Sequence, residues 1–226
     1  MEQKRLHLFA GHYGSGKTNI AVNYALHLAW EGKPVCIADL DIVNPYFRTA
    51  DSALALSDAG IRLVTSQFTN SNVDLPALPP EAYALVMDRS LHGIMDIGGD
   101  DRGAYALGRY APFIRAENNY CMSFVVNCYR PLTATVEDAL DVMREIETAC
   151  GIAFTAIINN SNLGDQTTEE TVMDSLEFVQ QLSRQSGLPV WMHSVVSDLV
   201  PRLSAQVQPL FPLQLQPKYF DLIKMD

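Results

Sequence analysis

The sequence has 226 residues, of which 48% are hydrophobic and 19% charged, and its formal net charge is -10. This composition suits a single domain over residues 1–226 with a sizeable core, and it excludes long disordered segments. The negative charge argues against non-specific nucleic-acid binding and against attachment to an anionic membrane, because both surfaces are themselves negative.

Apolar runs of strand length alternate along the chain with longer helical patterns. The alternation predicts an α/β fold in which a mostly parallel central sheet of about seven strands carries helices on both faces. The expected strands are near-continuously apolar: Arg5–Ala10, Pro34–Leu40, Arg62–Ser66, Gly93–Ile97, Tyr120–Asn127, Ala153–Asn159 and Pro189–Val195. The expected helices are Thr18–Trp30, Thr133–Cys150 and Thr167–Ser186, each followed within two residues by a glycine.

Two regions interrupt this alternation. Phe68–Pro80 is rich in Asn, Ser and Pro, which predicts an ordered surface loop. The stretch "PLFPLQLQP" (209–217) is interrupted by prolines, and we expect it to pack on the surface. The following "KYFDLIKMD" (218–226) predicts at most a short amphipathic helix and a poor membrane anchor.

The sequence also indicates a cellular compartment. No run approaches the roughly 18 apolar residues of a membrane span, and the N-terminal residues lack the apolar region of a signal peptide. The four cysteines, Cys36, Cys121, Cys128 and Cys150, form no C-x-x-C pair, so we expect reduced thiols. These features predict a cytoplasmic protein.

A complete phosphate-binding loop, Gly11-x-x-x-x-Gly16-Lys17-Thr18, lies between the first expected strand and the first helix. Its glycines allow backbone N–H groups to converge on phosphate oxygens, and the helix N-terminus adds partial positive charge. Lys17 is expected to reach the β- and γ-phosphates, and Thr18 to offer its hydroxyl to Mg²⁺. The expected nucleotide-binding residues are Gly11, His12, Tyr13, Gly14, Ser15, Gly16, Lys17, Thr18 and Asn19.

Carboxylates follow two of the expected strands. Asp39 and Asp41 close the second strand, and Asp96 ends the strand that precedes Gly98 and Gly99. A phosphate loop needs such groups to hold a metal ion and to order a water molecule, and the carboxyl ends of parallel strands meet at one crevice. The alternative interpretation of either site is an ordinary Asp-Gly turn.

In these residues the chain resembles the deviant Walker A ATPases, the MinD/ParA/Mrp (CobQ/CobB/MinD/ParA nucleotide-binding) group that includes the nitrogenase iron protein. Asp39-Leu40-Asp41 matches the D-x-D of that group, and Asp96-Ile97-Gly98-Gly99-Asp100 looks most like the D-x-x-G-D of the iron protein branch. The resemblance implies a P-loop NTPase that binds and hydrolyses ATP with Mg²⁺. It also implies a molecular switch that acts on a protein partner in assembly, maturation or positioning.

The resemblance further assigns roles to single residues. Asp41 would orient the attacking water, with Lys17 and Asp100 as further catalytic residues, and Gly99 would approach the γ-phosphate. The expected metal-site residues are Thr18, Asp39, Asp41 and Asp96, of which Asp39 and Asp96 would act mostly through bound waters. Asn159, or else Asn160, would read adenine, and Asp198 would belong to the loop that closes over the base. The alternatives are a strand-end turn residue for Asn159 and a helix cap or turn residue for Asp198.

His12 and Tyr13 depart from the pattern of the group, which has a lysine and a glycine at these positions. In the group that lysine reaches the nucleotide of a dimer partner. A histidine is shorter and carries less positive charge at pH 7 than a lysine. His12 is therefore either a weakened substitute or a solvent-facing loop residue, and we expect a monomer or a weak nucleotide-dependent homodimer.

Two other function classes fit the same loop. One is a small-molecule phosphotransferase, for which Arg102, Arg109, Arg115 and Arg130 could surround the transferred phosphoryl group. The other is a nucleotide-binding module that does not hydrolyse its ligand, which the set of carboxylates disfavours. A metal-cluster carrier is disfavoured because the chain has no C-x-x-C and its five histidines are scattered.

Overall fold

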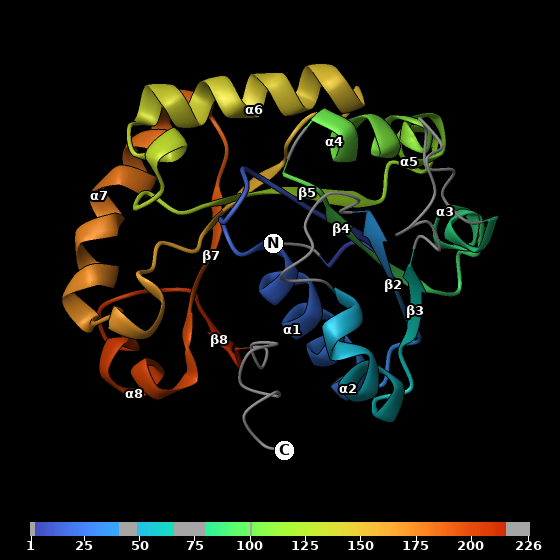
Figure 1. The fold of residues 1–226 in the computed structure, drawn as a ribbon, viewed down its shortest axis with the longest axis horizontal. Coiled ribbons are helices and arrows are strands. Elements are labelled where there is room, and N and C mark those ends of the chain that lie inside the picture. Colours follow the sequence, from blue (N-terminus) through green and yellow to red (C-terminus); the bar gives the residue numbers. More distant parts are fainter. Residues whose placement is uncertain (1–2, 41–48, 66–79, 100, 216–226) are drawn as a thin grey trace.

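The centre of the structure is a sheet of eight parallel strands (Figure 1). The computed structural model describes residues 3–40, 49–65, 80–99 and 101–215. The order across the sheet is β3 (Arg62–Thr65), β2 (Val35–Leu40), β4 (His92–Ile97), β1 (Leu6–Ala10), β5 (Tyr120–Val126), β6 (Ala156–Asn159), β7 (Val190–Val196) and β8 (Leu210–Leu213). The predicted fold class is confirmed, and the seven expected strands are all present.

Strand β8 corrects the expectation for the C-terminal stretch. The stretch was expected to pack on the surface, with no strand predicted in it, yet Leu210–Leu213 pairs in parallel with β7, with His193 opposite Leu210 and Val196 opposite Leu213. Pro212 is tolerated because β8 is an edge strand, where one row of backbone groups needs no partner. The expected helix at 218–226 and the expected loop Phe68–Pro80, apart from Pro80, lie outside the described residues.

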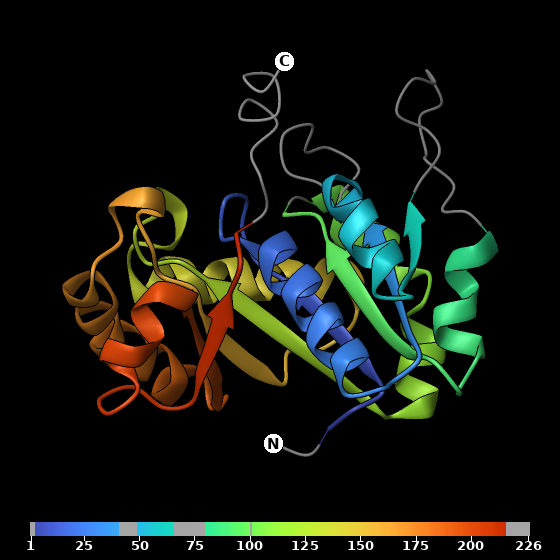
Figure 2. The same ribbon diagram turned by 90° about the horizontal axis from the view of Figure 1, so that it is seen from below.

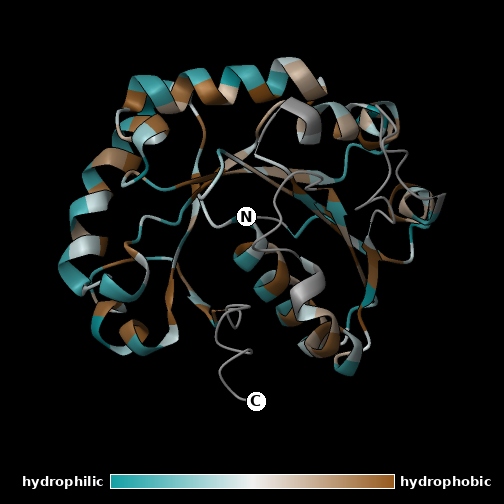
Figure 3. Ribbon diagram, in the orientation of Figure 1, coloured by the Kyte–Doolittle hydropathy of each residue, from teal (hydrophilic) through white to brown (hydrophobic). Residues whose placement is uncertain are grey.

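Helices cover both faces of the sheet because alternate side chains of each strand point to opposite sides. Leu6 and Leu8 pack with α3 to α7, whereas Phe9 packs with α1 and α2. Figure 1 shows α1 and α2 on one side and α4, α5 and α6 on the other. In Figure 3 the strands are mostly brown, while α6 carries bands of both colours, as expected of a half-buried helix. The helices are α1 (Lys17–Trp30), α2 (Ala53–Asp58), α3 (Tyr83–Met87), α4 (Asp101–Gly108), α5 (Ala111–Glu117), α6 (Val136–Cys150), α7 (Glu169–Ser186) and α8 (Val200–Leu203).

The strand order fixes where a ligand can bind. β1 lies between β4 and β5, so the chain leaves the middle of the sheet through the loop that follows β1. Figure 2 shows that loop at the edge towards which the arrowheads point, at the start of α1. In open parallel sheets the crevice beyond the carboxyl ends of the strands is the usual ligand site. None of the helices within the described ranges has the length and apolar character that crossing a bilayer requires.

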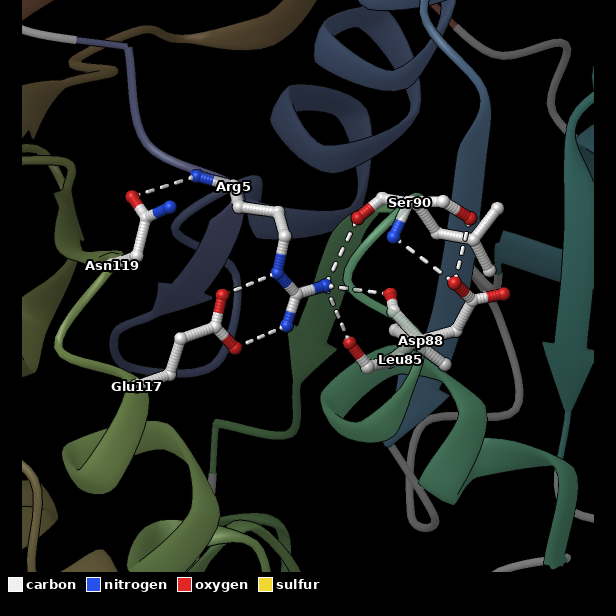
Figure 4. A network of polar contacts seen from close by, with 7 residues as sticks. Arg5, Leu85, Asp88, Ser90, Glu117 and Asn119 are labelled. Carbon is white, nitrogen blue, oxygen red and sulfur yellow. Dashed lines mark hydrogen bonds and ion pairs between the residues drawn. The ribbon is translucent and has the colours of Figure 1, made fainter.

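The amino end of β1 is held by a buried arginine (Figure 4). The Arg5 guanidinium donates to both carboxylate oxygens of Glu117 at 2.5 Å, and Nη1 donates to the carbonyls of Leu85, Asp88 and Leu91 at 2.8 to 3.2 Å. The pKa of Glu117 is lowered, mainly because its carboxylate accepts these hydrogen bonds from Arg5. This network joins β1 to the end of α5 and to the turn after α3.

His7 lies on the face of β1 that packs against α1, inside an aromatic cluster. Its ring stacks on Trp191 with centroids 5.4 Å apart, and its Nε2 donates to the carbonyl of Lys4 at 2.9 Å. Only 2% of His7 is exposed, and this burial lowers its pKa to about 4. The imidazole is therefore neutral at physiological pH and contributes to the core as an aromatic ring.

Candidate nucleotide-binding site

The phosphate-binding loop has the backbone that its glycines allow. Gly16, the residue before α1, has φ of 88°, a left-handed conformation that disfavours any side chain. A Cβ at Gly16 would also collide with the Asn160 amide nitrogen. Lys17 and Thr18 are buried at the start of α1, and the Lys17 ammonium donates to the His12 carbonyl at 3.1 Å. The lysine thus lies across the loop to which it belongs.

The segment after β4 lies directly against this loop. A Cβ at Gly99 would stand 2.5 Å from the Tyr13 backbone nitrogen and 2.9 Å from the Lys17 ammonium nitrogen. Real Cβ atoms do not come so close to other atoms, so only glycine fits here. The Gly98–Gly99 turn is therefore in contact with the groups expected to hold phosphate.

Two of the predicted metal-site carboxylates are neighbours in the sheet. Asp39 of β2 and Asp96 of β4 pair opposite each other at the carboxyl ends of their strands, and both are buried. The hydroxyl of Thr49, which sequence reasoning did not single out, donates to an Asp96 carboxylate oxygen at 3.0 Å. The sheet register therefore brings together two carboxylates that are 57 positions apart in sequence.

Asn160 joins the phosphate loop to the other half of the sheet. Its amide nitrogen donates to the Ser15 carbonyl at 2.6 Å, and its amide oxygen accepts from the Ser194 hydroxyl at 2.8 Å. Only 3% of Asn160 is exposed. Both ends of this amide are thus occupied by contacts within the protein.

The Asn159 amide lies deeper and is also committed. Its nitrogen donates to the Ser175 hydroxyl at 2.9 Å and to His193 Nδ1 at 3.1 Å, while its oxygen accepts from the Ser161 backbone nitrogen. Burial lowers the pKa of His193, which keeps its Nδ1 available as an acceptor. In this arrangement Asn159 fastens the end of β6 to α7 and β7.

A cavity of about 400 Å³ opens at this edge of the sheet. Phosphate-loop residues line one part of its wall, the loop after β6 lines another, and apolar side chains complete it. The lining residues are Tyr13, Gly14, Gly16, Lys17, Thr18, Asn19, Arg130, Asn160, Ser161, Asn162, Gly164, Asp165, Thr167, Val172, Ser194, Val195, Val196, Leu213 and Leu215. A site with polar groups beside an apolar wall suits a ligand that has both characters.

The C-terminal part of the wall is fastened to α1. The Asn23 amide donates to the Gln214 carbonyl at 2.9 Å and accepts from the Gln214 backbone nitrogen at 2.9 Å. This pair of hydrogen bonds extends the contact between β8 and α1 to Gln214, which lies between Leu213 and Leu215. It fixes both leucines as part of the cavity lining.

Arg130 reaches the phosphate loop from the end of β5. Its Nε donates to the Gly14 carbonyl at 3.1 Å, and the side chain is otherwise exposed in the cavity wall. Arg115, another of the four arginines considered above, instead donates to the Gly151 carbonyl at the end of α6. Of the two, only Arg130 belongs to the cavity.

The predicted site residues are thus distributed unevenly. Those that line the cavity are Tyr13, Gly14, Gly16, Lys17, Thr18, Asn19 and Asn160. Those that are described but lie outside the lining are Gly11, His12, Ser15, Asp39, Asp96, Gly99, Asn159 and Asp198. Asp198 is exposed in the 3₁₀ turn Ser197–Leu199. Asp41 and Asp100 lie outside the described residues.

Sequence reasoning did not single out two parts of the lining, the loop after β6 and β8. The stretch 194–200 was expected to close over the base, and Ser194, Val195 and Val196 of it line the cavity. The loop after β6 was open to prediction, because Asn162 and Asp165 directly follow an expected strand at the carboxyl edge. Leu213 gave no such signal, since an apolar residue that faces a ligand has the same sequence pattern as one that faces the core.

Comparison with known proteins supports the fold without assigning a family. The sequence matches no protein-family model and no curated protein. Among solved structures, the cell division protein FtsY of Thermotoga maritima aligns over 86% of this chain and 63% of its own, with a TM-score of 0.56 and 16% identity. The signal recognition particle 54 kDa protein of Aeropyrum pernix K1, in complex with GDP, covers 82% of this chain and 40% of its own, with a TM-score of 0.52 and 16% identity.

A third neighbour is closer in size. The nucleotide-binding protein of Archaeoglobus fulgidus, in complex with ADP, covers 87% of this chain and 85% of its own, with a TM-score of 0.50 and 15% identity. The chain thus spans less than two thirds of the first two proteins and most of the third. At these identities the likeness establishes the P-loop NTPase fold and leaves the activity to the site itself.

Proposed function

We propose that this chain binds ATP together with Mg²⁺, hydrolyses it, and uses the change to control the binding of a protein partner. The observation that carries the proposal is the cavity that joins Lys17 and Thr18 to an apolar wall made by Val172, Val195 and Leu213. A nucleotide has the matching division, with charged phosphates at one end and an aromatic base at the other. ADP or ATP would lie with its phosphates over the loop and its base against the apolar wall.

The residues present fit a magnesium ion. Mg²⁺ prefers oxygen ligands and keeps several waters, and the Thr18 hydroxyl together with the Asp39 and Asp96 carboxylates offers oxygen donors from three adjacent elements. When bound, the ion would neutralise charge on the phosphates. By resemblance to the deviant Walker A ATPases, Asp41 would orient the attacking water.

The structural neighbours are consistent with a nucleotide as ligand but differ in its base. The Archaeoglobus protein was solved with ADP and the Aeropyrum protein with GDP. Our preference for adenine rests on the family resemblance. Asn159 does not line the cavity, and the amides of Asn160 and Asn162 are engaged within the protein, so we assign base contact to Asp165 in the loop after β6, which lines the cavity. A competition titration tests the preference for adenine. GTP binding at least tenfold tighter than ATP would reverse it.

A switch is favoured over a phosphotransferase by the arginines. A phosphotransferase usually gathers several of them around the transferred group, yet Arg115 is bound to the end of α6 and Arg109 does not line the cavity. A phosphate-transfer scan with small acceptors separates the two functions. The switch proposal predicts that the phosphoryl group is transferred to water, giving inorganic phosphate, whichever acceptor is present.

The first experiment is calorimetric titration of ATP with Mg²⁺ into wild type and Lys17→Ala. Loss of a charge-assisted hydrogen bond predicts roughly ten- to a hundred-fold weaker binding. Lys33→Ala, which removes a lysine after the far end of α1, is the matched control and should bind like wild type. Equal ATP affinity in wild type and Lys17→Ala would refute the assignment of the loop.

A second measurement separates binding from hydrolysis. Asp41→Asn should keep ATP bound and slow phosphate release, because the amide keeps the size of the carboxylate and loses its charge. Wild-type turnover in this variant would exclude Asp41 as the water-positioning group.

A further inference from the structure

The inference concerns Arg130, which brings a second positive charge into the cavity from the same chain. Its Nε donates to the Gly14 carbonyl at 3.1 Å. The ideal Cβ position of Gly14 lies 3.6 to 4.0 Å from the guanidinium end of Arg130, so the side chain runs along the loop backbone. Among the described residues that line the cavity, Lys17 and Arg130 carry positive charge and Asp165 is the one carboxylate.

The chain fixes the backbone of Arg130 before any ligand binds. Arg130 precedes Pro131, which favours an extended conformation, and its φ and ψ are -102° and 136°. Its backbone nitrogen donates to the Asn127 carbonyl at 3.1 Å, and the Thr133 hydroxyl donates to the same carbonyl at 2.8 Å. Asn127 in turn donates to the Asn162 carbonyl at 3.0 Å. The turn after β5 is thus tied to the loop after β6.

The guanidinium has donors left over. One of its five N–H groups is used by Gly14, and within the described ranges no carboxylate lies at ion-pair distance from it. By contrast, Arg5, Arg144 and Arg202 each pair with a carboxylate. A charged fork beside a phosphate loop matches the geometry of phosphate oxygens, which guanidinium groups bind in pairs.

We propose that Arg130 binds the phosphate chain of the nucleotide within its own subunit, on the side of the loop that carries Gly14. The inference rests on the proposed nucleotide binding and adds to it the source of the second cation. A chain that supplies this charge itself needs no second subunit to complete the phosphate site. Phosphate affinity is therefore independent of protein concentration.

The test is titration of ATP, ADP and adenosine into wild type, Arg130→Ala, Arg130→Lys and Arg130→Gln. Arg130→Ala should weaken ATP and ADP roughly tenfold and leave adenosine unchanged, since a charge-assisted contact is lost. Arg130→Lys keeps the charge but loses the paired contact, so its affinity should fall between wild type and Arg130→Ala, whereas Arg130→Gln should resemble Arg130→Ala. Added salt should weaken ATP binding less in Arg130→Ala than in wild type, because one charge fewer is screened.

Two controls separate this role from support of the loop. Arg144→Ala removes an exposed arginine of α6 and should leave every affinity and the salt dependence unchanged. If Arg130 only braced Gly14, Arg130→Gln would bind ATP as well as Arg130→Lys and the salt dependence would stay that of wild type. Either result would overturn the inference.

The outcome also distinguishes this inference from the proposed function. Wild-type binding that depends on Lys17 but not on Arg130 would refute only the role of Arg130. Absence of ATP binding in wild type would refute both. ATP affinity that rises with protein concentration would show that a second subunit completes the site, and would also contradict the inference.

Discussion

Two arginines at opposite ends of the central strands show how the molecule divides its tasks. Arg5, at the amino end of β1, is 6% exposed, donates to both oxygens of Glu117 and binds three carbonyl groups. Arg130, just beyond the carboxyl end of β5, is exposed and donates to one carbonyl. At one end of the sheet the donors of an arginine are bound by the protein, and at the other end most donors of a second arginine are available to a ligand.

The difference follows from the parallel sheet. At the amino end of β1 the Arg5 guanidinium is buried, and a buried charge must find its partners within the protein. At the carboxyl ends the outgoing loops spread apart and leave a cavity. Arg5 is therefore expected to govern stability, and Arg130 to govern binding.

The largest effect expected from this comparison is on stability. Arg5→Ala should lower the free energy of unfolding by about 3–5 kcal/mol, because Glu117 would remain buried without its partner. Arg130→Ala should change it by less than about 0.5 kcal/mol, as for other exposed sites. Urea denaturation followed by circular dichroism measures both values.

A paired substitution is the control for the first effect. In Arg5→Met with Glu117→Leu, neither buried charge is left alone, so part of the lost stability should return. If Arg5→Ala and Arg130→Ala destabilised the protein equally, the division between the two ends of the sheet would be wrong.

The second effect concerns the pH dependence of stability at the amino end. The pKa of His7 is about 4 in the folded protein and 6.5 by its ordinary value, so the unfolded chain binds more protons between these two pH values. The contribution of His7 is present in full above pH 6.5 and is lost as the pH falls to 4. The loss is about 3 kcal/mol.

Urea denaturation between pH 7.5 and pH 4 checks this prediction against His7→Phe. The phenyl ring keeps the stacking on Trp191 and cannot be protonated, so the variant should lose less stability on acidification. His92 and His193, whose pKa values are also lowered by burial, are present in both proteins and cancel in the comparison. Parallel curves for the two proteins would contradict a buried neutral His7.

The smallest effect concerns Asn160, at the carboxyl end. Asn160→Ala removes the hydrogen bonds to Ser15 and Ser194, and we expect ATP binding to weaken by about 1–2 kcal/mol. Because the role proposed here is to hold the loop, binding of GTP should weaken in proportion. Calorimetry with both nucleotides decides: loss for ATP alone would restore Asn160 to the base-reading role expected from the sequence.

The sequence predicted the sheet well because its strands are buried on both faces. Near-continuous apolar runs such as Tyr120–Asn127 leave little alternative to a central parallel strand. β8 was missed because it has only four residues and one of them is Pro212. It forms a strand through its pairing with β7, which is a tertiary contact that the local sequence does not show. Short helices such as α3 were missed for a similar reason, since five residues are too few for a periodic pattern.

The phosphate side of the site was predictable, and the base side was not. Glycine spacing and Lys17 are local signals with a direct physical reason. Asn159 was the preferred reader of the base and Asn160 the second candidate. Their hydrogen bonds to Ser175, His193, Ser15 and Ser194 depend on tertiary contacts that no local pattern reveals. Arg130 was named only as one of four arginines, because sequence does not tell which of them faces the loop.

The bond between Asn23 and Gln214 has a consequence for the order of synthesis. The two residues are 191 positions apart, yet together they place the last described strand beside the first helix. A ribosome makes the phosphate loop long before Leu213 and Leu215 exist to line the cavity. A nascent chain that has reached α7 already carries every glycine of the loop, but its nucleotide pocket still lacks one side. If nucleotide binds in this cavity as we propose, its tight capture requires that Leu215 has left the ribosome.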